Sequence, residues 1–268
     1  SSCDWTRTAF TMDEKFSRGV IKVFVEMYKL GLVYKGRRLA NLSCRLETAI
    51  SNDEIEHKTV KGHFYHIKYP VAGEPGRFVE IATTRPETML GDTAVAVHPD
   101  DPRYKDLVGQ RVILPIIGRE LPVIADEYVD RDKGTGCLKV TPAHDPNDYA
   151  LGKRHNLEFI NILTVNGTLN ENAGPYAGID RLKARPQVVE RLKEEGLLVK
   201  IVDLEHEVAH CSRSDDVIEP YLCDQWYVKM DRFVELARKA GQEGRVKFTP
   251  ERYMATYLHW LDSTPDWP

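Results

Sequence analysis

The sequence predicts an α+β protein in which a β-rich middle, folded as a barrel or a sandwich, is flanked by helical ends. Short alternating apolar and polar runs, separated by glycine and proline, fill residues 60–140, and many short strands with close turns are typical of a barrel or sandwich. Helical periodicity appears on both sides of this middle, at residues 13–30 and again after residue 230. A chain of 268 residues, 42% hydrophobic and 29% charged, can form one large domain or a core with a smaller appendage.

The expected elements follow in order from the hydrophobic pattern. Residues 13–30 predict a helix, because apolar side chains recur at helical spacing and Gly31 supplies a stop. A connection then runs from Asn41 to Ser51. Strands are expected at 64–69, 78–83, 93–97, 111–115, 121–126 and 137–140. The remaining prediction consists of helices at 145–155 and 180–195, a strand pair within 198–209, and helices at 231–240 and 249–260.

The bulk composition narrows the class of protein. The formal net charge of −4 provides no global basic field for RNA, so contact with nucleic acid must come from local clusters such as 35–38 and 153–155. No signal peptide or long apolar run is present, and we expect a cytoplasmic protein. The five cysteines are scattered without a C-x-x-C pair, which favours free thiols; a zinc site using Cys44 and Cys211 with two histidines stays an open alternative.

The most informative run is GTGCLKVTPAHDPNDY, at residues 134–149. A short strand ends here in a loop that gathers an ammonium, a hydroxyl, an imidazole and two carboxylates: Lys139, Thr141, His144, Asp145 and Asp148. Polar groups that converge at the end of a rigid element are typical of a reactive site. A structural role also explains the two acids, because Asp145 before Pro146 fits an N-cap and Asp148 fits the first turn of a helix.

A second run, ATTRPETMLGD at residues 82–92, follows a predicted strand. Together the two runs resemble the editing domain of class I aminoacyl-tRNA synthetases, an insertion that hydrolyses mischarged tRNA. The segments ATTRPET and KVTPAHDPND are similar to those of the valine-specific branch, the valyl-tRNA synthetases. Glu87, in the first segment, argues against the leucine and isoleucine siblings. The resemblance extends over nearly the whole chain, through residues 3–13, 170–185 and 216–230.

The resemblance implies a β-barrel editing domain with packed helices and flanking helical stalk segments. Its expected parts are an N-terminal stalk or linker at 1–54, the barrel at 55–212 and a returning stalk with helices at 213–268. No H-I-G-H-type or K-M-S-K-S-type string occurs, so we expect no aminoacylation from this chain. The last residues, 263–268, depart from the family pattern, and we expect an excised insertion whose partner is the catalytic core of a parent synthetase.

The resemblance also implies an activity: hydrolysis of the ester that joins threonine to the 3′ acceptor end of tRNA(Val), by a monomer that needs no cofactor or metal. The expected catalytic residues are Asp148, Thr141, Lys139 and Asp145. The residues expected to bind substrate are Asp148, Asp145, Thr83, Thr84, Arg85, Glu87 and His144. We expect Asp148 to meet the α-ammonium and Asp145 the threonine γ-hydroxyl, while Arg85, with the two threonines before it, holds the terminal adenosine or its phosphate.

Three questions stay open at the level of sequence. His144 is a candidate general base, although attack by an oriented water, assisted by the ribose hydroxyl of the substrate, is the preferred route. Lys133 occupies a position that is commonly apolar in the family, which leaves the shape of that pocket wall undefined. The alternative functions are a tRNA acceptor-end binding module with little hydrolysis, and an editing domain of the leucine or isoleucine siblings.

Overall fold

The computed structural model describes residues 3–267; the last residue of the predicted segment 263–268 and the first two of segment 1–54 lie outside this range. Within it the α-helices are α1 (Glu14–Lys29), α2 (Pro146–Arg154), α3 (Arg181–Glu194), α4 (Asp231–Gln242) and α5 (Tyr253–Asp262). The strands are β1 (Val33–Ser43), β2 (Thr48–Ile50), β3 (Ile55–Pro70), β4 (Phe78–Thr83), β5 (Ala94–Val97), β6 (Arg111–Ile113), β7 (Glu120–Ala125), β8 (Cys137–Val140), β9 (Leu198–Cys211) and β10 (Ile218–Val228). Short 3-10 helices are η1 (Asn52–Glu54), η2 (Pro86–Gly91), η3 (Lys105–Leu107) and η4 (Glu171–Tyr176).

The predicted helices are confirmed, and their ends have local causes. The Asp180 side chain caps α3 by accepting hydrogen bonds from the amides of Leu182 and Lys183, at 3.0 and 3.2 Å. Such a cap satisfies amides that have no partner inside the helix. The same helix stops before Gly196, whose φ of 69° is left-handed and favours glycine.

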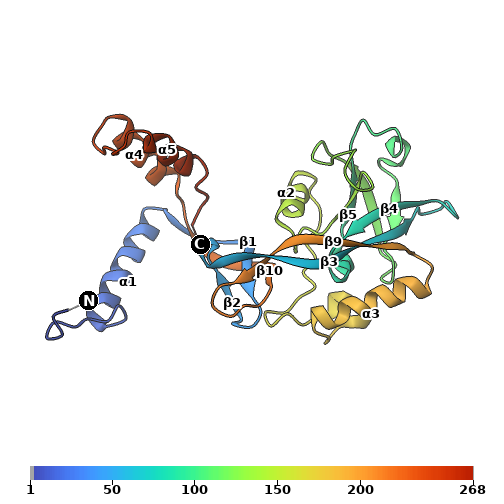
Figure 1. The fold of residues 1–268 in the computed structure, drawn as a ribbon, viewed down its shortest axis with the longest axis horizontal. Coiled ribbons are helices and arrows are strands. Elements are labelled where there is room, and N and C mark those ends of the chain that lie inside the picture. The colour runs from blue at the N-terminus through green and yellow to red at the C-terminus, as the bar shows by residue number, and fades with distance from the viewer. Residues whose placement is uncertain (1–2, 268) are drawn as a thin grey trace. The chain divides into compact units, whose positions relative to one another are not determined.

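The strands form three sheets in the described part of the chain, ordered β10-β1-β2, β4-β3-β9 and β6-β7-β5-β8. Figure 1 shows β3 and β9 as one long two-stranded ribbon, paired antiparallel from Ile55↔Cys211 to the neighbourhood of Ile67. The strand pair predicted within 198–209 is therefore wrong, since this segment is a single strand. Helix α3 packs against β9 and η2, and α2 packs against β8.

The closed barrel that we expected is not formed by the described residues. One isolated bridge, Val71↔Val112, joins the end of β3 to β6, and β4 lies against β8 without a ladder of paired residues. A barrel requires hydrogen bonds between every neighbouring pair of strands. The backbone ladder is interrupted at both of these seams, so the fold is α+β with open sheets.

Three strands were missed in the predicted stalk segments. Strand β1 lies mostly before the expected connection and overlaps it only at residues 41–43, and its sequence VYKGRRLANLS carries three charged residues on a half-exposed surface. Strand β10 contains Pro220, which lacks the amide that a central ladder requires. Strand β2 has only three residues. Patterns of this kind do not alternate strongly enough to stand out from loops.

The chain divides into two compact units: Leu39–Cys223 forms one, while the other combines the chain up to Arg38 with the chain from Asp224 onward. The main hydrophobic core lies in Leu39–Cys223 and includes fully buried residues from β3, β4, β5 and α3, among them Ile67, Ile81, Val95 and Leu192. The predicted boundaries near residues 54 and 212 stay a prediction.

Among residues 3–267, no helix is long and apolar enough to cross a membrane. The cysteines of this range form no disulfide with one another, and Cys44, Cys137 and Cys211 are buried. The zinc alternative gains no support, because the described side chains form no cluster of three or more metal-ligating groups.

Candidate active site

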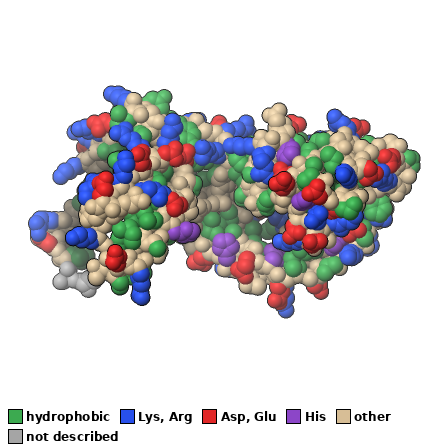
Figure 2. All heavy atoms as spheres, turned by 90° about the horizontal axis from the view of Figure 1, so that it is seen from above, with side chains coloured by type: hydrophobic (Ala, Val, Ile, Leu, Met, Phe, Trp, Pro, Cys, Tyr) green, Lys and Arg blue, Asp and Glu red, His purple; other side chains and the backbone are tan. Residues whose placement is uncertain are grey.

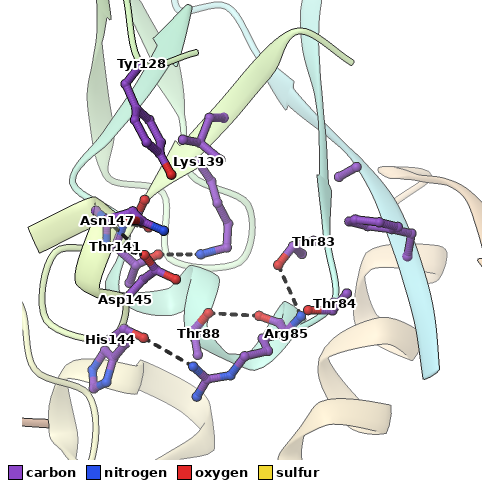
Figure 3. A pocket seen from close by; sticks show the side chains of 14 residues that line it. Thr83, Thr84, Arg85, Thr88, Tyr128, Lys139, Thr141, His144, Asp145 and Asn147 are labelled. Carbon is purple, nitrogen blue, oxygen red and sulfur yellow. Dashed lines mark hydrogen bonds between the residues drawn. The ribbon is translucent and has the colours of Figure 1, made fainter. Parts of the chain in front are cut away.

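The two sequence runs meet at a polar pocket of about 240 Å³ in the unit Leu39–Cys223. Figure 3 shows its walls, which come from β4 and η2 on one side and from β8 and α2 on the other. Of the nine predicted site residues, eight line the pocket and Glu87 does not. The lining side chains are Phe64, Ala82, Thr83, Thr84, Arg85, Thr88, Tyr128, Leu138, Lys139, Thr141, His144, Asp145, Asn147 and Asp148.

The floor of the pocket is built where β5 pairs antiparallel with β8. The register Val95↔Lys139 places Asp92, just before β5, beside Lys139 and Thr141. Lys139 Nζ donates to Thr141 Oγ1 and lies 3.4 Å from Asp92 Oδ1. All three side chains are buried. The floor therefore presents an ammonium and a hydroxyl that are held in fixed positions.

Asp148 lies on the first turn of α2, with only 6% of its surface exposed. Its Oδ2 accepts a hydrogen bond of 2.8 Å from the Thr141 amide, which ties the helix to the end of β8. Burial raises the pKa of Asp148 to about 7, against the opposing charge of Lys139 and with a smaller contribution from the charge of Asp145. The carboxyl is therefore poised to ionise when a cation enters the pocket.

Asp145 is the N-cap of α2. Its Oδ1 accepts hydrogen bonds from the amides of Asn147 and Asp148, at 2.8 and 3.1 Å. Both bonds end on the same oxygen, so Oδ2 has no hydrogen-bond partner among the described residues. Asp145 was expected to be either a cap or a ligand. Its Oδ1 caps the helix, and its Oδ2 is available to bind a ligand.

Arg85 lines the pocket, and two of its donors are used inside the protein. Nη1 donates to the His144 carbonyl at 3.2 Å, and Nη2 pairs with Glu219, which is also bound by Arg181 at 2.6 Å. A guanidinium has five N–H donors, so these two contacts leave donors for the predicted phosphate contact, which stays a prediction. The same guanidinium joins the β4–η2 turn to β10.

Glu87 belongs to the same buried network and not to the pocket surface. Its two carboxylate oxygens accept from Arg185 of α3, each at 2.8 Å, while Arg85 lies 3.7 Å away. A bidentate arginine pair of this kind fixes geometry. We therefore find Glu87 supporting the wall formed by η2 and making no contact with the cavity.

His144 is held in a structural position. Its Nε2 accepts a hydrogen bond of 2.9 Å from the Ile162 amide, and the imidazole is 1% exposed. Burial, and then the charge of Arg85, lowers the pKa of His144 to about 3. The ring lone pair is occupied, so the general-base alternative has no free acceptor; Figure 3 shows the ring turned away from Lys139 and Thr141.

The threonine-rich wall and the pocket rim complete the site. Thr83 Oγ1 accepts from the Arg85 amide at 3.1 Å, and Thr88 Oγ1 donates to the Arg85 carbonyl at 2.9 Å, so both shape the turn. Thr84 lines the pocket, as predicted. Two aromatic rim residues, Phe64 and the half-exposed Tyr128, were missed by sequence reasoning because each lies outside both motifs.

The basic residues singled out in the sequence do not line the cavity. Lys133 is exposed and does not line the pocket, so it leaves the wall unchanged. In the cluster 153–155, Arg154 and His155 both pair with Asp126. In the cluster 35–38, Arg38 pairs with Asp266. Figure 2 shows charges of both signs interspersed over the face in view.

Sequence comparison defines the class to which this fold and pocket belong. A profile of the tRNA synthetases class I (I, L, M and V) matches residues 1–268, and the chain belongs to this family. The match includes 263–268, so the prediction that these residues depart from the family is wrong.

Within the family, the chain is similar to valine–tRNA ligases. It is 53% identical to that of Bdellovibrio bacteriovorus over 266 residues, which cover 99% of this chain and 30% of the relative. It is 52% identical to that of Thermotoga maritima over 267 residues, 100% of this chain and 31% of the relative. The enzyme of Geobacillus stearothermophilus is 54% identical over 265 residues, 98% of this chain and 30% of the relative. The chain thus spans about 30% of the length of the curated relatives it matches.

Proposed function

We propose that the chain hydrolyses the ester bond of threonyl-tRNA(Val), as the editing domain of a valine–tRNA ligase. The observation that carries the proposal is the convergence of Lys139, Thr141, Asp145 and Asp148 on one polar cavity, with a free carboxylate oxygen on Asp145. The similarity to valine–tRNA ligases supports the choice of amino acid and tRNA, and argues against the leucine and isoleucine siblings.

The polarity of the pocket suits the discrimination that such an enzyme requires. Threonine and valine have nearly the same shape, and an apolar pocket rejects an added hydroxyl poorly; valyl-tRNA synthetase is itself the standard example of this limit, at about 10²-fold. A second, hydrolytic site must therefore select threonine through its hydroxyl. The unused Oδ2 of Asp145 is an acceptor for that group.

The remaining residues have complementary roles. Asp148 binds the α-ammonium of the aminoacyl group, and a cation in the pocket favours its ionised form. Lys139 donates to the ester carbonyl oxygen. Water attacks the acyl carbon, the bond to the ribose oxygen breaks, and that oxygen takes a proton, so threonine and free tRNA are released. The neighbouring ribose hydroxyl orients the water, since His144 has no free acceptor.

The proposal includes the surroundings of the site. The chain acts as a monomeric part of a longer cytoplasmic ligase, whose catalytic core carries out aminoacylation, and it requires no cofactor. The three-part division at residues 54 and 212 belongs to the same proposal. The terminal adenosine of the tRNA rests on the wall that includes Thr83 and Thr84.

The deciding experiment is single-turnover deacylation of threonyl-tRNA(Val) by this chain and by Asp148→Ala. We expect the wild-type chain to exceed spontaneous hydrolysis, and the substitution to slow it by about 10- to 100-fold, because one charge-assisted hydrogen bond is lost. Valyl-tRNA(Val) serves as the substrate control and should remain intact. A fully active Asp148→Ala chain would contradict the assigned role of this acid.

A second candidate is an acceptor-end binding module that hydrolyses little by itself. The net charge of −4 and the engagement of Arg38 and Arg154 in ion pairs favour weak binding, since phosphate contacts dominate affinity for RNA. The same experiment separates the two functions, because a binding module would retain tRNA on a filter at low salt while the ester decays at its spontaneous rate.

A further inference from the structure

A buried carboxylate lies directly beneath the pocket floor. Asp92 follows η2, is 0% exposed and does not line the cavity. Its Oδ1 accepts a hydrogen bond of 2.5 Å from Thr141 Oγ1, and its Oδ2 accepts one of 2.7 Å from Tyr69 Oη. Lys139 Nζ lies 3.4 Å from the same Oδ1.

The hydrogen bonds of Asp92 determine whether the Thr141 hydroxyl offers a hydrogen or a lone pair to a ligand in the pocket. A hydroxyl has one hydrogen to donate and two lone pairs. Thr141 gives its hydrogen to Asp92 and accepts from Lys139, so the group left for the pocket is a lone pair. Lys139 has three hydrogens, and one is left after those used on Thr141 and Asp92. The floor therefore offers an acceptor at Thr141 next to a donor at Lys139.

Close backbone packing maintains this arrangement. A side chain at Gly91 would lie 3.0 Å from the Ile160 carbonyl and 3.4 Å from Thr141 Cγ2, so glycine allows the turn before Asp92 to approach β8. Burial raises the pKa of Asp92, while the charge of Lys139 and the hydrogen bonds from Thr141 and Tyr69 act in the opposite direction. If Asp92 served only to balance the charge of Lys139, it would not also need the short hydrogen bond from Thr141.

We propose that Asp92 is a positioning residue that fixes Thr141 as a hydrogen-bond acceptor and Lys139 as a donor toward the substrate. The proposal rests on the proposed hydrolysis of threonyl-tRNA. Asp92 itself touches no substrate atom. Without Asp92 the Thr141 hydroxyl is free to rotate and to point its hydrogen into the pocket. That hydrogen then faces the hydrogen-bond donors of the substrate, which need an acceptor.

The test is a double-mutant cycle in single-turnover deacylation of threonyl-tRNA(Val) with the full chain. We expect Asp92→Asn and Thr141→Val each to slow the reaction by about tenfold or more, because each disturbs a charge-assisted hydrogen bond. The double variant should be only about twofold slower than the slower single variant, since groups that act as one unit are not additive. The dissociation constant for uncharged tRNA should not change.

Asp101→Asn is the matched control, because Asp101 is a carboxylate of the same unit, 1% exposed and bound to Arg103 away from the pocket. Its rate should stay within about twofold of wild type, and its losses should multiply with those of Thr141→Val. Multiplied losses in the Asp92 cycle would instead reduce Asp92 to a purely structural residue and overturn the proposal.

The remaining outcomes are also decisive. If Asp92→Asn does not fold, Tyr69→Phe loosens Asp92 from its far side, and a folded Tyr69→Phe chain should be about threefold slower at unchanged tRNA affinity; an unaltered rate rejects the positioning role. An active wild-type chain with an equally active Asp92→Asn overturns this inference alone. A wild-type chain that never exceeds spontaneous hydrolysis overturns the proposed function and this inference with it.

Discussion

At the scale of one residue, Asp148 combines a structural cost with a proposed functional role. Its carboxyl is buried and its pKa is raised to about 7. Between the pKa of the unfolded chain, near 3.8, and that of the folded chain, the native state holds a proton that the unfolded state has lost. The free energy of unfolding therefore falls as pH rises through this window, and the full penalty is present above pH 7.

We predict that Asp148→Asn stabilises the chain at alkaline pH while slowing the proposed deacylation. Asparagine keeps an oxygen for the Thr141 amide but carries no charge, so at pH 8.5 we expect a gain of about 2 kcal/mol in the free energy of unfolding. At pH 4 the two proteins should be equally stable. Denaturant unfolding at both pH values measures the difference, and a gain that is the same at pH 4 and pH 8.5 would show that Asp148 does not titrate between them.

The residues of the pocket were predictable to different extents. Lys139, Thr141, Asp145 and Asp148 lie in one run, so their meeting at the end of β8 requires only a strand and a helix N-terminus. Asp92 stands in the other run, and its contact with them depends on the β5–β8 register. The alternation of residues within one segment does not reveal how that segment pairs with another one some 40 residues away.

Helix α2 shows at the scale of an element why a cap and a ligand can be one residue. The Asp145 Oδ1 atom satisfies two amides of the first turn, and the Oδ2 atom faces no partner among the described residues. Serine is an equally good N-cap but lacks the second oxygen. The capping role of Asp145 and its proposed role as a ligand can therefore be separated by the choice of replacement.

We predict that Asp145→Ala lowers the free energy of unfolding by about 1 kcal/mol, whereas Asp145→Ser leaves it nearly unchanged. Both variants should lose the proposed preference for threonyl over 2-aminobutyryl esters of tRNA(Val), because neither has a second oxygen, beyond the cap, to accept from the γ-hydroxyl. Thermal unfolding and paired deacylation rates measure the two effects. An Asp145→Ser chain that still prefers the threonyl ester would assign the acid to capping alone.

Elements were predictable where one physical signal dominates. Helices α1 to α4 have a capping side chain or a glycine stop, α5 has neither, and each was found. The strands β1 and β10 were missed because charged residues in the first and Pro220 in the second conceal their alternation. Closure of the barrel could not be judged from sequence, since it depends on hydrogen bonds across the β3–β6 and β4–β8 seams.

The two compact units differ in their hydrophobic cores at the scale of the whole molecule. The unit Leu39–Cys223 contains the main core, in which every residue of β5 is 0% exposed. In the other unit, α1 and α5 contain no buried residue, and α4 contains only Gly241. Burial of apolar surface is the main source of helix stability in proteins. The stability of the chain should therefore be concentrated in one unit.

We predict that amide hydrogen exchange in α1 is about 100-fold faster, or more, than in α3, because local opening is cheap where few apolar contacts are lost. The two helices are a matched pair: α1 has 16 residues and α3 has 14, and α3 buries Ala184, Val188 and Leu192 along one face. Peptide-resolved mass spectrometry at neutral pH measures both helices in one sample, with β5 as the slow reference. Equal protection of α1 and α3 would mean that α1 is held by apolar contacts other than those of the described residues. Since intrinsic helix propensity alone stabilises a helix of this length only marginally in water, the exchange rate reports tertiary burial directly.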